Sequence, residues 1–184
     1  TNEILNGDIH SANQRLAGLE SRNQAKTFIY AFLYGAGNAK IGSVVKAGQS
    51  RGKQLREQFL NSLPSLKSLV QRVQRDSKKG FLKGLDGRKV AVRSEHAALN
   101  TLLQSAGAIV MKEALVVLEK KIRHLDAKFV ANVHDEWQIE CLEEDAKQVG
   151  DAGIEAIIEA GKNLNLNCPL DGDYNIGDGW HETH

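Results

Sequence analysis

Residues 22–37, RNQAKTFIYAFLYGAG, decide the fold of the first part of the chain. Ser21 stands just before this segment and Gln24 follows three residues later, which is the capping-box pattern of a helix start. Gly35 comes at the other end, where glycine commonly terminates a helix. The segment therefore predicts a helix that begins after Ser21 and ends at Tyr34.

Four side chains of this helix recur at intervals of four residues and share one slowly turning face: Arg22, Lys26, Tyr30 and Tyr34. Two cations near the positive end of a helix suit phosphate groups, and two aromatic rings further along suit a sugar or a base. The face is thus typical of a nucleotide site. The alternative is a structural helix with its tyrosines in the core and its cations in solvent, and spacing alone leaves both interpretations open.

The rest of the chain predicts further helices and two short hairpins. Helices are expected over 8–18, 38–46, 50–62, 64–78, 95–122 and 143–161. Strands flank the turns at Asp86-Gly87 and His134-Asp135, giving hairpins over 81–93 and 127–141. The tail 163–184 is expected to be irregular with one strand. The predicted class is α+β, with a helical part over 1–79 and a part over 80–184 that combines a small antiparallel sheet with long helices.

Charge is distributed very unevenly along the chain, although the formal net charge is only +1. Residues 22–93 hold 16 Lys/Arg against three acids, a net charge of +13. Residues 94–184 hold seven Lys/Arg against 17 acids, a net charge of −10. This asymmetry favours a polyanion partner for the basic segment and a metal-binding role in the acidic one.

Composition excludes several classes of protein. The hydrophobic fraction of 41% and the small net charge exclude a mainly disordered chain. No stretch of about 18 purely apolar residues occurs, so we expect no membrane partner. Cys141 and Cys168 lack metal-type spacing, which predicts neither a zinc site nor a disulfide scaffold and fits a reducing compartment.

Val133-His134-Asp135-Glu136 lies between two apolar strands. A tight turn can direct a carboxylate towards a divalent metal, and neighbouring acids repel unless a cation relieves them. The alternative is an ordinary polar turn. One aspartate is also too few for a two-metal site, which needs a second bridging carboxylate.

The long helix 95–122 carries a second polar series, Asn100 and Gln104 followed by Gly107, on a face distinct from its leucines. Amide side chains can contact the acceptors that every base pair presents in the minor groove. A solvated helix face explains the same residues equally well.

Four segments together resemble family A DNA polymerases, most closely those of short-tailed bacteriophages. They are GDIHSANQ (7–14), RNQAKTFIYAFLYGAG (22–37), GLDGRKVAVRSEHAALNTLLQSAGA (84–108) and VHDE (133–136), in the family's order. The resemblance covers nearly the whole chain. It implies a helical fingers subdomain over 1–79 and an incomplete, C-terminal part of the palm over 80–184.

The resemblance implies a role for each matching residue. Those implied to bind the incoming deoxynucleotide are His10, Arg22, Lys26, Tyr30 and Tyr34, with Lys26 also catalytic. Asp135 and Glu136 are implied to be catalytic: Asp135 ligates the Mg²⁺ ions, of which the complete site has two, and Glu136 lies close by. Residues implied to contact primer–template DNA are Arg93, Asn100, Gln104 and His134.

The family's other metal-binding aspartate, its thumb and its exonuclease domain have no counterpart in this sequence. We therefore expect nucleotidyl transfer from a deoxynucleoside triphosphate to a primer 3′ end only together with an N-terminal polymerase part, in the same chain or in a separate one. A processivity factor is a further possible partner. The resemblance to phage enzymes places the reaction in the cytoplasm of a bacterial host. Three explanations of the short chain are open: a fragment, a split gene, or a protein-splicing junction at Thr1.

Two other functions compete with this expectation. The first is a DNA-binding polymerase remnant without catalytic activity, in which the basic segment grips phosphates and the His134-Asp135 turn is idle. The second is a metal-dependent nuclease built around Asp135, for which the sequence offers too few carboxylates.

Overall fold

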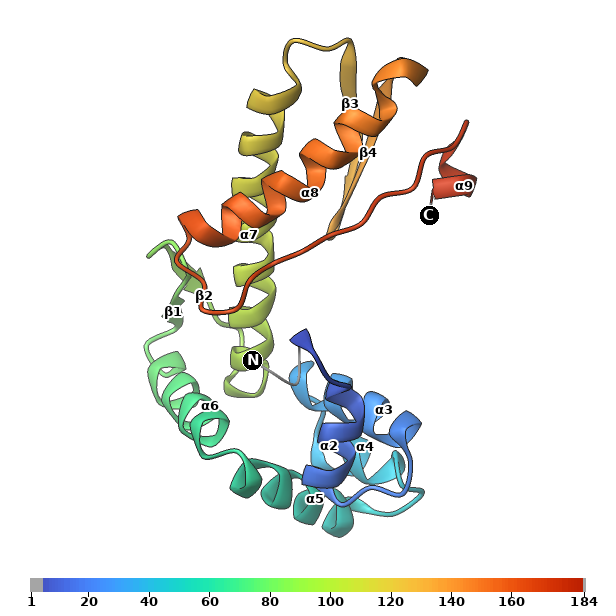
Figure 1. Ribbon diagram of the computed structural model, residues 1–184. Coiled ribbons are helices and arrows are strands. Elements are labelled where there is room, and N and C mark those ends of the chain that lie inside the picture. Colours follow the sequence, from blue (N-terminus) through green and yellow to red (C-terminus); the bar gives the residue numbers. More distant parts are fainter. Residues whose placement is uncertain (1–4, 184) are drawn as a thin grey trace. The chain divides into compact units, whose positions relative to one another are not determined.

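The computed structural model describes residues 5–183 as two compact units, one ending at Leu103 and the other beginning at Gln104. Five α-helices precede the first hairpin among the described residues of the first unit (Figure 1): α2 (Ile9–Ala17), α3 (Arg22–Leu33), α4 (Asn38–Ser43), α5 (Gln49–Ser62) and α6 (Pro64–Ser77). All five predicted helices of this region are confirmed, with ends within a few residues of those expected. Pro64 starts α6, where its missing N–H costs no helical hydrogen bond.

Three phenylalanines form the centre of the first unit's core. Phe28 and Phe32 lie one turn apart on α3, and their ring centroids are 5.2 and 5.5 Å from the Phe59 ring of α5, in edge-to-face geometry. Edge-to-face pairs are favoured by the aromatic quadrupole. Ile41 and Leu55 complete this centre and are fully buried, so α3 is fixed against α5 by one of its faces.

Helices α4 and α5 meet at two glycines. A Cβ atom built on Gly52 of α5 would lie 2.6 Å from the backbone nitrogen of Gly42 and closer still to the carbonyl oxygen of Asn38. Both neighbours are backbone atoms, so no side chain can turn aside to make room. The absence of a side chain at Gly52 therefore sets how closely these two helices approach.

A hairpin of β1 (Phe81–Lys83) and β2 (Lys89–Ala91) follows α6. Leu82 of β1 packs with Val73 of α6 and Ala98, the first residue of α7 (Ala98–Ile122). This packing joins the hairpin and the start of α7 to the first unit. The compact units consequently divide after Leu103, and the expected boundary between residues 79 and 80 does not coincide with that division.

The second unit contains the rest of α7, a two-stranded antiparallel sheet and α8 (Ala146–Asn163) (Figure 1). Its strands are β3 (Ala127–Val133) and β4 (Glu136–Cys141), with an irregular register between Phe129 and Ala131. Its core joins the three elements through a set of apolar residues: Val117, Leu118, Ile122, Val149, Ala156 and the half-buried Trp137 and Ile139. The predicted α+β class, with small antiparallel sheets and long helices, is confirmed.

The C-terminal tail contains no strand among its described residues, so the strand expected within 163–184 is wrong. Tyr174 instead holds the tail against α8: its hydroxyl donates to Asp151 (2.9 Å) and its ring lies against Gly150. Side-chain contacts therefore replace a backbone ladder, and the tail ends in the short helix α9 (Trp180–Thr183).

One helical stretch, Glu95–Ile122, is long and apolar enough to cross a membrane by length and composition, with a mean hydropathy of 1.5 over its most apolar window. Polar uncharged residues within it explain why no purely apolar run of that length occurs. Core helices of soluble proteins meet the same criterion.

Gly52→Ala tests the close approach of α4 and α5. We expect a loss of about 1–3 kcal/mol in the free energy of unfolding, because the new methyl group meets backbone that must move. Gly153→Ala is the matched control: this glycine also lies inside a helix, α8, but a Cβ there meets nothing within 4 Å. The control should be neutral or stabilise by up to about 1 kcal/mol. Chemical denaturation followed by circular dichroism measures both, and equal effects would contradict the proposed packing constraint.

Candidate active site

Helix α3 carries the predicted nucleotide face on its exposed side. The Ser21 hydroxyl accepts from the Gln24 backbone N–H (3.2 Å), and the Gln24 side chain accepts from the Glu20 N–H (3.1 Å), so the predicted N-terminal cap is present. Tyr30 and Tyr34 are 47% and 60% exposed. The alternative in which these tyrosines belong to the core is therefore wrong.

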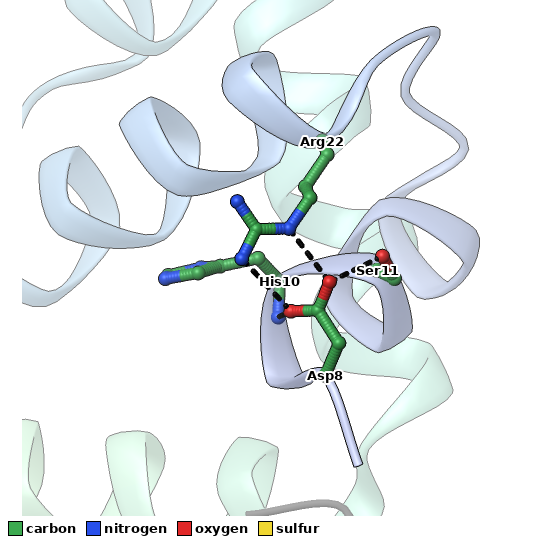
Figure 2. Close-up of polar contacts among 4 residues, drawn as sticks. All are labelled: Asp8, His10, Ser11 and Arg22. Atoms are coloured by element: carbon green, nitrogen blue, oxygen red, sulfur yellow. Dashed lines mark hydrogen bonds and ion pairs between the residues drawn. The ribbon is translucent and has the colours of Figure 1, made fainter.

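Arg22, the first residue of α3, is paired with Asp8 (Figure 2). Its Nε donates to Asp8 Oδ2 at 2.6 Å and its Nη2 to Oδ1 at 3.3 Å. The carboxylate also accepts from the Ser11 hydroxyl (2.7 Å) and the His10 backbone N–H (3.0 Å). The hydrogen bond from Arg22, followed by that from Ser11, holds the pKa of Asp8 well below its ordinary value. The same pair raises the pKa of Arg22.

His10 lies beside Tyr30, with the ring centroids 6.2 Å apart and the planes tilted by 51°. Its Nδ1 is buried and has no hydrogen-bond partner among the described residues. The first unit thus brings together three of the predicted nucleotide-binding residues: His10 and Tyr30 through their rings, and Arg22 through Asp8.

Lys26 lies one turn after Arg22 on the exposed face, and no described carboxylate is within ion-pair distance of it. Tyr34 forms the C-cap of α3 and is followed by Gly35 at φ 76°. A Cβ atom on Gly35 would lie 2.6 Å from the carbonyl oxygen of His96. Only glycine suits this conformation and this approach, and the end of α3 therefore lies against the residues that lead into α7.

Three of the predicted DNA-contacting residues lie just before or on α7, and the fourth, His134, lies in the turn between β3 and β4. Arg93 is exposed in the bend before α7, and Asn100 is half-buried in the first turn of that helix. Gln104 is exposed one turn later, at the start of the second unit. Asn100 and Gln104 therefore lie one turn apart on the same helix.

The turn between β3 and β4 consists of His134 and Asp135, with Val133 paired to Glu136 on either side. Both turn residues are exposed, and His134 has a positive φ of 55°. Glu136 is half-buried and accepts a hydrogen bond from the Gln138 side chain, whose own oxygen accepts from the Thr183 hydroxyl at 3.1 Å. The arrangement leaves Asp135 open to a ligand and holds Glu136 in one orientation.

Within residues 5–183, no three His, Cys, Asp or Glu side chains lie together as a metal-binding group. Asp135 and the adjacent Glu136 offer two carboxylates, which fit part of a divalent-metal site but do not complete a two-metal one. The nucleotide face belongs to the first unit and these carboxylates to the second.

Three further residues of this site escaped the sequence interpretation: Asp8, Gln138 and Thr183. Asp8 had a detectable signal, because it is the first residue of the predicted helix 8–18 and aspartate is a preferred N-cap residue. Gln138 and Thr183 are 45 residues apart and carry no local pattern that links them.

Comparison with known proteins identifies the family of this chain. The model of DNA polymerase family A matches residues 5–182. The chain belongs to this family. It is 45% and 44% identical to the DNA-directed DNA polymerases of Enterobacteria phage T3 and Escherichia phage T7, over 99% of its own length and 29% of theirs. The chain therefore spans less than a third of the length of the curated relatives it matches.

A solved structure shares the fold. The POL domain of Pol1 from M. smegmatis, in complex with DNA primer-template and dNTP, superposes with a TM-score of 0.76 at 21% sequence identity. The match covers 86% of this chain and 32% of that one. It shows that the fold is shared, whereas the family model and the phage polymerases confirm the resemblance to family A that the four sequence segments indicate.

Acid titration tests the pairing of Asp8 with Arg22. Because the folded pKa lies below the unfolded value of about 4, the pair stabilises the fold fully above that value and loses this contribution as the pH falls towards the folded pKa. We expect the Asp8 Cγ resonance in NMR spectra to stay that of a carboxylate below pH ~4. In Arg22→Ala it should titrate at higher pH, since the principal cause of the shift is gone. An unchanged titration in that variant would contradict the assignment.

Proposed function

We propose that this chain supplies the nucleotide-binding surface and one metal-binding carboxylate of a template-directed DNA polymerase. The reaction is transfer of a nucleotidyl group from a deoxynucleoside triphosphate to a primer 3′ end. The observation that carries the proposal is the exposed face of α3, on which two cations precede two accessible tyrosines. Family membership supports the same reaction.

The two ends of the exposed α3 face bind different parts of the nucleotide. Arg22 and Lys26 bind the triphosphate, and Lys26 offsets the charge that develops on the leaving pyrophosphate. His10 assists through its ring, which lies beside Tyr30. Tyr30 stacks by the sugar and Tyr34 by the templating position, because both rings are accessible and lie successively further from the cationic end.

Contacts to DNA come from both units. Arg93, Asn100 and Gln104 line the minor groove of the newly formed base pairs, where amide and guanidinium donors meet acceptors common to all sequences. His134 contacts the primer terminus from the turn that also carries Asp135. The positive charge of residues 22–93 supplies the general attraction for phosphates.

Asp135 ligates divalent metal, for which Mg²⁺ is the expected ion, and Glu136 lies next to it. When bound, such ions activate the primer 3′-hydroxyl and neutralise charge on the phosphate. The remaining carboxylate ligand comes from an N-terminal polymerase part, whose palm would cover the exposed Phe129 and Val130 of β3. A processivity factor and a location in bacterial cytoplasm belong to the same proposal.

Reconstitution of primer extension tests the role of Asp135. The chain is combined with an N-terminal part of a phage relative that carries the other catalytic aspartate, and incorporation of labelled deoxynucleotide is measured. We expect extension from the combination and none from the chain alone. Asp135→Asn should lower the rate by roughly a thousandfold or more, because a lost metal ligand removes several kcal/mol of transition-state stabilisation.

Asp173→Asn is the matched control for this experiment. It removes one exposed carboxylate of the second unit that has no proposed role, and incorporation should be unchanged. DNA binding should survive in Asp135→Asn and decrease steeply with salt in all variants. Full incorporation by Asp135→Asn would contradict the proposal and favour the non-catalytic DNA-binding alternative. Extension or DNA hydrolysis by the chain alone would contradict the expectation that an N-terminal part must supply the remaining carboxylate.

A further inference from the structure

We infer that Asp8 is a positioning residue that orients Arg22 for the triphosphate, an inference that rests on the proposed function. The Asp8 carboxylate accepts four hydrogen bonds from three residues (Figure 2): one from the His10 backbone, one from the Ser11 hydroxyl and two from Arg22. The proposed function gives a role to Arg22 but none to Asp8.

The carboxylate is fixed by its own helix before Arg22 reaches it. Asp8 is the N-cap of α2, in an extended conformation (φ −111°, ψ 100°), and its side chain accepts from the His10 N–H. Its carbonyl accepts from the Ala12 N–H at 2.9 Å, which closes the first helical turn. Asp8 is therefore a rigid partner, and it orders Arg22 more than Arg22 orders it.

The pairing leaves most of the guanidinium available. A guanidinium has five N–H groups, and Asp8 uses one on Nε and one on Nη2. Nη1 is turned away from the carboxylate (Figure 2), and the Arg22 side chain remains 52% exposed. Both N–H groups of Nη1 and the second N–H of Nη2 thus remain available to phosphate oxygens. Because the guanidinium is planar, its two hydrogen bonds to the carboxylate also fix the plane in which these groups point.

Two effects of Asp8 on nucleotide binding have opposite signs. Its negative charge repels a triphosphate, but both side chains are exposed and solvent screens that repulsion. Its hydrogen bonds remove the rotamer freedom of a long side chain before the nucleotide arrives, so this ordering cost no longer opposes binding. We assign the net effect to ordering, and Asp8 then strengthens nucleotide binding despite its charge.

Asp8→Asn separates orientation from helix capping. Asparagine caps helices as well as aspartate, and its carbonyl oxygen can still accept from the His10 N–H, so α2 is retained. The charge-assisted pair with Arg22 is lost. We expect the Kd for dATP with Mg²⁺, measured by calorimetry on the full chain, to rise about three- to tenfold, the range for immobilising one long side chain during binding.

A double-mutant cycle shows whether Asp8 acts through Arg22. In an Arg22→Lys background, which lacks the planar fork, Asp8→Asn should change the Kd by less than about twofold, because coupled residues are not additive. Asp86→Asn is the matched control: it breaks a similar exposed pair, Asp86 with Arg88 (2.6 Å), in the hairpin of the same unit. Nucleotide affinity should be unchanged in that variant.

The Arg22 Nε–H resonance gives a readout that needs no nucleotide. It should resist exchange with solvent in the parent chain and lose that protection in Asp8→Asn. Equal or tighter dATP binding by Asp8→Asn, the same loss in the Arg22→Lys background, or an unprotected Nε–H in the parent would each overturn the inference. Failure of the proposed function looks different: dATP then does not bind the parent, or binds Lys26→Ala equally well, while Nε–H protection still depends on Asp8.

Discussion

The packing of Phe28 and Phe32 against Phe59 is the interaction on which the nucleotide face depends. This packing buries one side of α3 in the core of the first unit and leaves the opposite side exposed to solvent. A helix has one rotation about its axis that buries two large rings at this spacing. The exposure of Tyr30 and Tyr34 is therefore a consequence of core packing as much as of their own chemistry.

The same packing determines which partners the polar residues of α3 can reach. Because Arg22 lies at the first helical position, its guanidinium extends beyond the helix end, where Asp8 caps the preceding helix. One carboxylate then serves two helices, as a cap for α2 and as a partner for α3. Local capping and the geometry of the candidate site are thus coupled through a single side chain.

Much of this structure is predictable because it is encoded locally. The strands 127–133 and 136–141 have the bounds that the turn at His134-Asp135 predicts, and the start of α3 follows from Ser21 and Gln24. Contacts between distant residues determine what local patterns do not predict. The tail lacks the expected strand, because side-chain contacts with α8 replace strand pairing. The compact units divide after Leu103 because the hairpin and the start of α7 pack on α6, and no local pattern encodes that packing.

The turn between β3 and β4 holds His134 in an unfavourable backbone conformation with a positive φ. A non-glycine residue with a positive φ costs about 1–2 kcal/mol relative to the ordinary region, and His134 adopts such a φ between two paired strands. The close pairing of Val133 with Glu136 leaves only two residues to reverse the chain, so the strained conformation is retained by the flanking sheet. Only His134 of the two turn residues has a positive φ, so glycine at position 134 would make this turn with less strain, but it would carry no imidazole. The conformational cost therefore falls on the residue to which the proposed function gives a contact with the primer terminus.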